Sequence, residues 1–169
     1  MQKQEKETAN AGFTLIEILV VIGLIALLAA VVIVAINPAR QFAQGRDAQR
    51  TSNLNSILNA VSQRIADNKG VFEGTFKGGD GVDYICGLLP ATTTLVVADM
   101  ASGTTTESAA LKCLTPTYIQ ALPVDPSGKY TGANTGYSIY KDSGSGRIHV
   151  IATETEPNIP RTAILEIVR

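Results

Sequence analysis

One carboxylate, Glu17, stands at the start of a long stretch without charge. From Ile18 to Ile36 every residue is apolar or glycine, and no Lys, Arg, Asp or Glu occurs between Glu17 and Arg40. A charged side chain inside a hydrocarbon layer costs on the order of a few kcal/mol unless it reaches the interface or meets an opposite charge. Glu17 is therefore either an interfacial residue or a group that awaits a cation supplied from elsewhere.

The apolar stretch itself predicts a membrane-spanning helix over residues 13–36. A helix rises about 1.5 Å per residue, and roughly 20 apolar residues cross the hydrocarbon core. The stretch is longer than the apolar region of a cleaved secretory signal, which has roughly 7–15 residues, and no small-x-small cleavage pattern follows it. Pro38 lies just beyond its end, where it removes a helical hydrogen-bond donor.

The residues Gly12-Phe-Thr-Leu-Ile-Glu17, directly before this stretch, resemble the class III signal sequence of type IV pilins and type II secretion pseudopilins. The resemblance implies that residues 1–12 are a leader peptide, which a prepilin peptidase removes by cutting between Gly12 and Phe13. It also implies N-methylation of Phe13 and a role in assembly for Glu17, the hallmark acid of the family. The precursor is then expected to cross the cytoplasmic membrane once, with its head outside, before it enters an extracellular pilus or a periplasmic or envelope pseudopilus.

These residue types suit such processing. Gly12 lets a peptidase approach the backbone closely, and a cut on the polar side of the span keeps the helix in the membrane. Glu17 favours lateral assembly in lipid because the positive N-terminus of an adjacent subunit neutralises it. The leader departs from the usual basic pattern, since its two lysines are balanced by two glutamates. More Lys and Arg residues follow the span than precede it, and this count alone would place the leader outside the cytoplasm. The processing motif favours a cytoplasmic leader.

The partners implied by the resemblance are other copies of the chain, related minor pilins, the prepilin peptidase and methyltransferase, the membrane, and the inner-membrane assembly platform with its ATPase. A net charge of −1 and a pI near 5.8 give no reason for an obligate nucleic-acid partner. Three hypotheses stay open: a pilus subunit, a pseudopilin of a type II secretion system, and a membrane-anchored binding module that does not polymerise.

The segment 37–69 is predicted to continue the helix, giving a nearly continuous helix of roughly 80 Å from about Phe13 to Asn68. Its first part, up to about Asn53, has no continuous apolar stripe and is expected to be exposed or to wait for partners. Its last four turns carry one apolar face that should pack on the head. That face consists of Leu54, Ile57, Leu58, Val61 and Ile65.

The head, residues 70–169, is predicted to form an antiparallel sheet. Residues 136–141 and 147–152 alternate in polarity around the turn Asp-Ser-Gly-Ser-Gly, which is typical of a hairpin. Residues 95–98 and 163–168 are further strand candidates. A sheet against the helix would bury both apolar faces, so we expect an α+β fold in which a long N-terminal helix packs on a small antiparallel sheet, as in pilins.

The head also contains two candidate sites. Cys86 and Cys113 are either one disulfide or two unrelated buried thiols. Residues 122–128 look like part of the major type II secretion pseudopilin, in which a nearby loop binds calcium, so Asp125 and Asp142 are the candidate calcium ligands. The alternative for Asp125 is a Pro-fixed turn with an Asx hydrogen bond. No other metal or cofactor is expected.

The sequence does not favour an enzyme. The single histidine, His149, lies on a predicted strand, and neither H-E-x-x-H nor G-x-S-x-G occurs. Asp80 and Asp83 lie in a glycine-rich segment, where acids are typical of loops. We therefore expect a structural protein.

Overall fold

The computed structural model describes residues 12–91, 94–95, 111–132, 134–154, 156–157, 159 and 165–169. The chain divides into two compact units, of which the first ends at Gln41 and the second begins at Phe42. A long apolar helix, a second helix and small antiparallel sheets make up the described elements, which confirms the α+β, pilin-like fold expected from the sequence.

The first helix, α1 (Leu15–Ile36), forms from the uncharged stretch, and all its residues are exposed within the chain. Thr14 is its N-cap: the backbone N–H of Glu17 donates to the Thr14 hydroxyl, and the Glu17 carboxylate accepts from the Thr14 backbone in return. This reciprocal pair satisfies two of the donors that every helix start leaves open. The helix therefore begins at Leu15, two residues after the predicted start of the span at Phe13.

The nearly continuous helix predicted from Phe13 to Asn68 is interrupted at one residue, Asn37, which the sequence interpretation did not single out. Asn37 adopts the left-handed conformation, with φ 46° and ψ 81°, and α2 begins at Pro38. The Asn37 side-chain oxygen then accepts from the backbone N–H of Arg40 at 3.3 Å. Asparagine tolerates this conformation, and proline is suited to the first helical position because it has no N–H to satisfy.

The second helix, α2 (Pro38–Asp67), supplies one wall of the head core. The predicted apolar stripe is buried at Leu54, Ile57, Leu58 and Val61. The helix ends as predicted before Lys69 and Gly70, which both have positive φ, and the Gly70 N–H donates to the carbonyl of Ile65 at 2.8 Å.

Two antiparallel sheets follow. The four-stranded sheet has the order β3-β4-β5-β6, and the predicted hairpin forms its two central strands. A separate two-stranded sheet, β1-β2, was not predicted, because its strands flank a glycine-rich turn that was interpreted as a loop. The expected strand at 95–98 is described only at its first residue, and residues 96–98 lie outside the described part. The bounds are β1 (Gly74–Lys77), β2 (Asp83–Cys86), β3 (Thr94–Leu95), β4 (Tyr137–Lys141), β5 (Ile148–Ala152), β6 (Leu165–Val168) and the 3-10 turn η1 (Lys112–Leu114).

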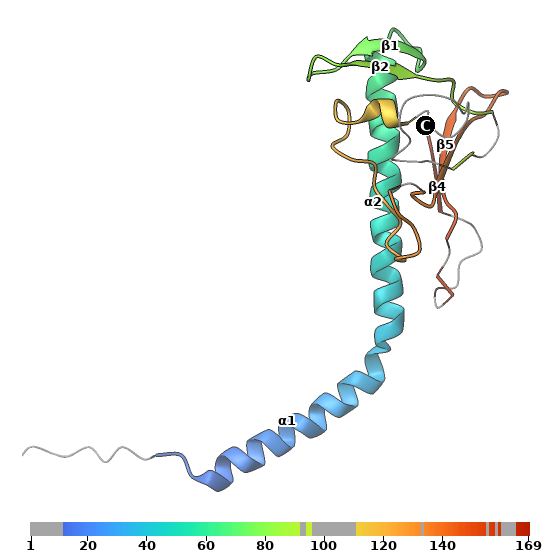
Figure 1. Cartoon of the computed structure of the whole chain (residues 1–169). Helices are drawn as coiled ribbons and strands as arrows, with labels where there is room; N and C mark the ends of the chain where they lie inside the picture. The colour runs from blue at the N-terminus through green and yellow to red at the C-terminus, as the bar shows by residue number, and fades with distance from the viewer. Residues whose placement is uncertain are drawn as a thin grey trace, which may run out of the picture. The chain divides into compact units, whose positions relative to one another are not determined.

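The core lies between α2 and one face of the larger sheet, which run side by side in Figure 1. Alternate residues of β4 and β5 supply the sheet's share: Tyr137, Ile139, Ile148, Val150 and Ala152 are all buried. A disulfide between Cys86 and Cys113 ties the end of β2 to η1, with the two Cα atoms 5.3 Å apart. This bond fixes the small sheet to the edge of the same core.

Candidate functional site

The residues expected to be processed lie at the exposed start of α1. Gly12 and Phe13 are both exposed, and 85% of Phe13 is accessible. A Cβ placed on Gly12 would meet no atom within 4 Å, so the chain itself does not require glycine at this position. Any requirement for Gly12 must come from an external partner, such as a peptidase that approaches the backbone.

Glu17 is bound to its own helix start. One of its oxygens, Oε2, accepts from the Thr14 backbone N–H at 2.9 Å and from the Thr14 hydroxyl at 2.8 Å. Among the described residues no donor contacts the other oxygen, Oε1. The sequence interpretation considered an interfacial position or an external cation for Glu17 but not a capping box, although the spacing Thr-x-x-Glu before an apolar run is its signature.

The rest of α1 offers an unbroken apolar surface. The mean hydropathy of its most apolar 18-residue stretch is 3.4. With 22 residues, the helix is long and apolar enough to cross a membrane. None of its residues is buried within the chain. A fully apolar exposed helix requires an apolar environment from outside the chain, either lipid or other helices. This fits membrane anchoring near the N-terminus.

Residues 8–35 match the family described as the prokaryotic N-terminal methylation motif. This class III signal is typical of type IV pilins and pseudopilins, and it covers the start of α1 with both Gly12 and Glu17. No curated protein and no solved structure matches the chain.

The chain thus carries a prepilin-type N-terminal signal, of the kind that is typical of type IV pilins and pseudopilins. The motif implies processing by a prepilin peptidase and assembly with other pilins. It is a structural signal, which favours a non-enzymatic role.

A second group of charged residues lies inside the head, where α2 meets two loops. Arg50 is 1% exposed, and its Nε lies 2.7 Å from Oδ2 of Asp125. Its Nη1 lies 2.7 Å from Oε1 of Glu156 and 3.0 Å from Oδ1 of Asp47. Arg46 also reaches Glu156, with Nε 2.7 Å from Oε1. Two guanidinium groups and three carboxylates therefore form one network, called the ion cluster below.

The helix up to about Asn53 was predicted to be exposed or to wait for partners, and most of it is exposed, but one of its faces is buried in the head. Ala43, Asp47, Arg50 and Asn53 are buried and lie on the helix face that continues into the apolar stripe from Leu54. Polar residues are tolerated there because each charge has a partner and each partner is hydrogen-bonded. The signal was present in the sequence, since these positions keep the spacing of the apolar stripe, but their polarity was interpreted as exposure or as a face that waits for partners.

The network shifts the pKa of both of its loop acids downward. The hydrogen bond from Arg46 is the main cause that lowers the pKa of Glu156 to about 2, with Arg50 adding to it. Burial raises the pKa of Asp125, but the hydrogen bonds from Arg50 and Ser127 outweigh burial, so that the pKa lies below its usual value. Both carboxylates are therefore ionised at neutral pH.

The two candidate calcium ligands are engaged within the chain. Both oxygens of Asp125 accept from Arg50, and Oδ1 also accepts from the backbone N–H of Ser127 at 2.9 Å, which is an Asx turn. Asp142 accepts from the backbone of Gly144 and from the Ser145 hydroxyl in the β4–β5 turn. Within the described ranges no group of three or more His, Cys, Asp and Glu side chains is arranged to hold a metal.

The remaining sequence candidates are dispersed. His149 lies on the sheet face away from the core, where its Nδ1 is 2.6 Å from Oε1 of Glu166 and its ring stacks on Tyr140. Asp80 accepts from the Tyr84 hydroxyl at 2.6 Å in the turn between β1 and β2. These contacts are local, and they do not bring His149 and Asp80 into one site.

Proposed function

We propose that this chain is a structural subunit of a type IV pilus, cut after Gly12, N-methylated on Phe13 and polymerised through α1. The alternatives are a pseudopilin of a type II secretion system and a membrane-anchored module that does not polymerise. The partners in this proposal are other copies, minor pilins, the peptidase and methyltransferase, and an inner-membrane platform with its ATPase. No cofactor is needed for this role, because assembly only buries surface.

The proposal rests on one observation: the methylation motif overlaps a helix whose residues are all exposed within the chain. The motif covers residues 8–35, and α1 is apolar, 22 residues long and wholly exposed within the chain. A simple anchor would need such a helix too, but it would not need a carboxylate inside it. In a polymer, each helix can leave lipid for a bundle of identical helices.

Glu17 supports polymerisation over simple anchoring. Its Oε2 is held by Thr14, which fixes the carboxylate at the helix start and leaves Oε1 to accept from outside. Removal of the leader would create a positively charged amine on Phe13 in every copy. A neighbouring amine could then bind Oε1, so that two costly charges in an apolar region neutralise each other.

The engagement of Asp125 favours the pilus over the pseudopilus. The similarity to the major pseudopilin rested on a short loop segment with Asp125 and Asp142 as calcium ligands. Asp125 instead binds the buried guanidinium of Arg50 with both oxygens, and a cation at the same carboxylate would have to displace it. The calcium argument for a pseudopilin is weaker as a result.

The experiment that separates the three hypotheses is fractionation of cells that express the chain with an active prepilin peptidase. The pilus hypothesis expects the processed chain in filaments sheared from the surface. Processed chain confined to the envelope would instead support a pseudopilus. Unprocessed, monomeric chain in the membrane would support the anchor and contradict polymerisation.

A further inference from the structure

Lys141 occupies a position on β4 that belongs to the core-facing row. Along this strand Tyr137 and Ile139 point to the core and are buried, and Lys141 is the next residue in the same alternation. In the sheet register Lys141 lies opposite Ile148, which is also buried. A lysine thus stands where the pattern of the sheet calls for an apolar residue.

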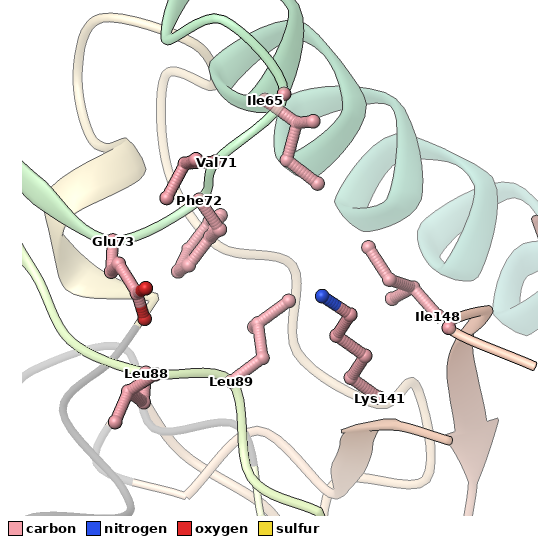
Figure 2. A pocket seen from close by; sticks show the side chains of 10 residues that line it. Ile65, Val71, Phe72, Glu73, Leu88, Leu89, Lys141 and Ile148 are labelled. Carbon is pink, nitrogen blue, oxygen red and sulfur yellow. The ribbon is translucent and has the colours of Figure 1, made fainter. Parts of the chain in front are cut away.

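The core opens into a cavity of about 320 Å³ at this end of the sheet. Figure 2 shows the Lys141 ammonium pointing into the space bordered by Phe72, Leu89 and Ile148. The lining comes from the end of α2, the segment before β1, the segment after β2 and the β4–β5 hairpin. The remaining apolar side chains of the lining are Ile65, Val71 and Leu88.

The acids near Lys141 do not neutralise it within the described residues. Asp142, its neighbour in sequence, is turned into the β4–β5 turn, where it accepts from Gly144 and Ser145. Glu73 lines the same cavity, but no ion pair joins it to Lys141. The Lys141 backbone is fixed, because its N–H donates to the Pro90 carbonyl at 2.8 Å. The exposed Lys141 thus places a positive charge at a largely hydrocarbon-lined cavity, and in the part of the chain that the structure describes no carboxylate is bound to it.

We propose that this cavity is a binding site for an apolar carboxylate, with the ligand's carboxylate on Lys141 and its hydrocarbon part among Ile65, Phe72, Leu89 and Ile148. The chemistry is shared by a small free carboxylic acid and by the C-terminal residue of a peptide. The volume lies near the lower end of small-molecule sites, roughly 300–1,000 Å³, so the ligand must be short. This site lies in the head, and the inference goes beyond assembly of the chain.

The simpler explanation is that the lysine stem covers apolar surface while the ammonium remains in water. Exposure of Lys141 fits that explanation. The two explanations differ in what the cavity selects. If the Lys141 stem only covers apolar surface, a carboxylate ligand and its neutral amide should bind equally well. If the ammonium binds the ligand, the negatively charged carboxylate should bind and the amide should not.

The test is an NMR titration of the full chain in lipid nanodiscs with isoleucine δ1-methyl groups labelled with ¹³C. Hexanoate is the free-acid probe, and hexanamide is its neutral match. The methyl signals of Ile65 and Ile148 report on the cavity, and those of Ile85, exposed on β2 and outside the lining, report on nonspecific contact. Empty nanodiscs correct for partition of the probes into lipid. We expect saturable shifts at Ile65 and Ile148, with a dissociation constant on the order of 1 mM for so small a ligand.

Lys141→Met should weaken hexanoate binding at least tenfold, and Lys141→Arg should retain it. Lys77→Met is the matched control, because Lys77 is exposed on β1 and does not line the cavity. The methyl signal of Ile57, in the core, shows whether each variant is folded. Equal shifts with hexanoate and hexanamide, equal binding by the Lys141→Met variant, or no saturable shift with either carboxylate source would overturn the proposal.

The two sources of the carboxylate are separated by a short peptide that ends in leucine, tested with a free and with an amidated C-terminus. Binding of the free-ended peptide, but not of the amide, assigns the site to chain ends. Binding of hexanoate alone assigns it to small acids. Because the nanodisc holds single chains, neither result depends on whether the chain forms pili.

Discussion

Arg50 and Asp125 form a two-point ion pair inside the head. Nε of Arg50 lies 2.7 Å from Oδ2 of Asp125, and Nη2 lies 3.1 Å from Oδ1, with 1% and 0% of the two side chains exposed. The pair joins α2 to the loop before β4, two segments that are 75 residues apart in sequence. The planar guanidinium suits this two-point contact, which a lysine could not reproduce.

Removing either member of this pair should destabilise the head strongly. Arg50→Met removes the cation that the three buried carboxylates share. Asp125→Asn removes one of the negative charges that surround Arg50. Loss of one partner of a buried pair costs about 3–5 kcal/mol in the free energy of unfolding. Urea unfolding of the chain in detergent, followed by the circular dichroism of its tyrosines, measures this cost.

The double-mutant cycle is the control for that prediction. If the pair is coupled, the Arg50→Met, Asp125→Asn double variant loses less stability than the sum of the two single losses. Additive losses would show that Arg50 and Asp125 act separately.

Acid should weaken the ion cluster in a defined pH range. The pKa of Glu156 falls from its ordinary 4.5 to about 2 because of Arg46 and Arg50. A group whose pKa is lowered by folding stabilises the protein above its unfolded pKa, and this contribution disappears as the pH falls from about 4.5 to 2. Because Arg46 is partly exposed, we expect a contribution on the order of 1–2 kcal/mol at pH 7.

Glu156→Gln isolates this effect. The difference in unfolding free energy between the natural chain and the variant should be largest above pH 5 and should shrink toward pH 2. A difference that stays constant from pH 7 to pH 2 would show that Glu156 is not held ionised by the two arginines.

Loss of the disulfide should destabilise the head without changing its fold. Cys86 and Cys113 are 27 residues apart, and closing a loop of this length stabilises by about 3–4 kcal/mol in the chain-entropy account. The Cys86→Ser, Cys113→Ser double variant should therefore unfold at a lower urea concentration. The reduced natural chain is its control, and equal stability of its oxidised and reduced forms would contradict the prediction.

The apolar half of the fold could be predicted from sequence because it depends on spacing alone. The uncharged run gave the bounds of α1 to within two residues, and Leu54, Ile57, Leu58 and Val61 are buried as their helical spacing indicates. The β4–β5 hairpin followed from alternation around a glycine-containing turn. These are local patterns, and the apolar side chains that they place on one face pack on the nearest apolar surface.

The polar half could not be predicted, because it depends on which residues meet in space. Arg50 is 75 residues from Asp125 and 106 from Glu156, and each alone resembles an ordinary surface charge. Asp125 was therefore interpreted as a turn residue or a calcium ligand, although its main partner is a guanidinium. The break at Asn37 was missed for a related reason: Pro38 fits the start of a new helix as well as the end of an old one.

Glu17→Val should leave membrane insertion intact and reduce fibre assembly. The substitution removes the one charge of α1 and so favours lipid, but it also removes the group that is proposed to bind a neighbour's amine. The yield of sheared fibres per membrane-bound chain measures assembly. Thr14→Ala is the matched control, because it removes the cap that holds the Glu17 carboxylate at a cost of about 1 kcal/mol but keeps the acid. An unchanged fibre yield in the Glu17→Val variant would remove Glu17 from the assembly mechanism.

The most direct test of the central claim is mass spectrometry of the N-terminal peptide of the chain purified from cells with an active prepilin peptidase. The account predicts a chain that begins at Phe13 and is heavier by one methyl group, and it predicts that Gly12→Ala impairs this cut. A chain that keeps residues 1–12 in those cells would contradict the account.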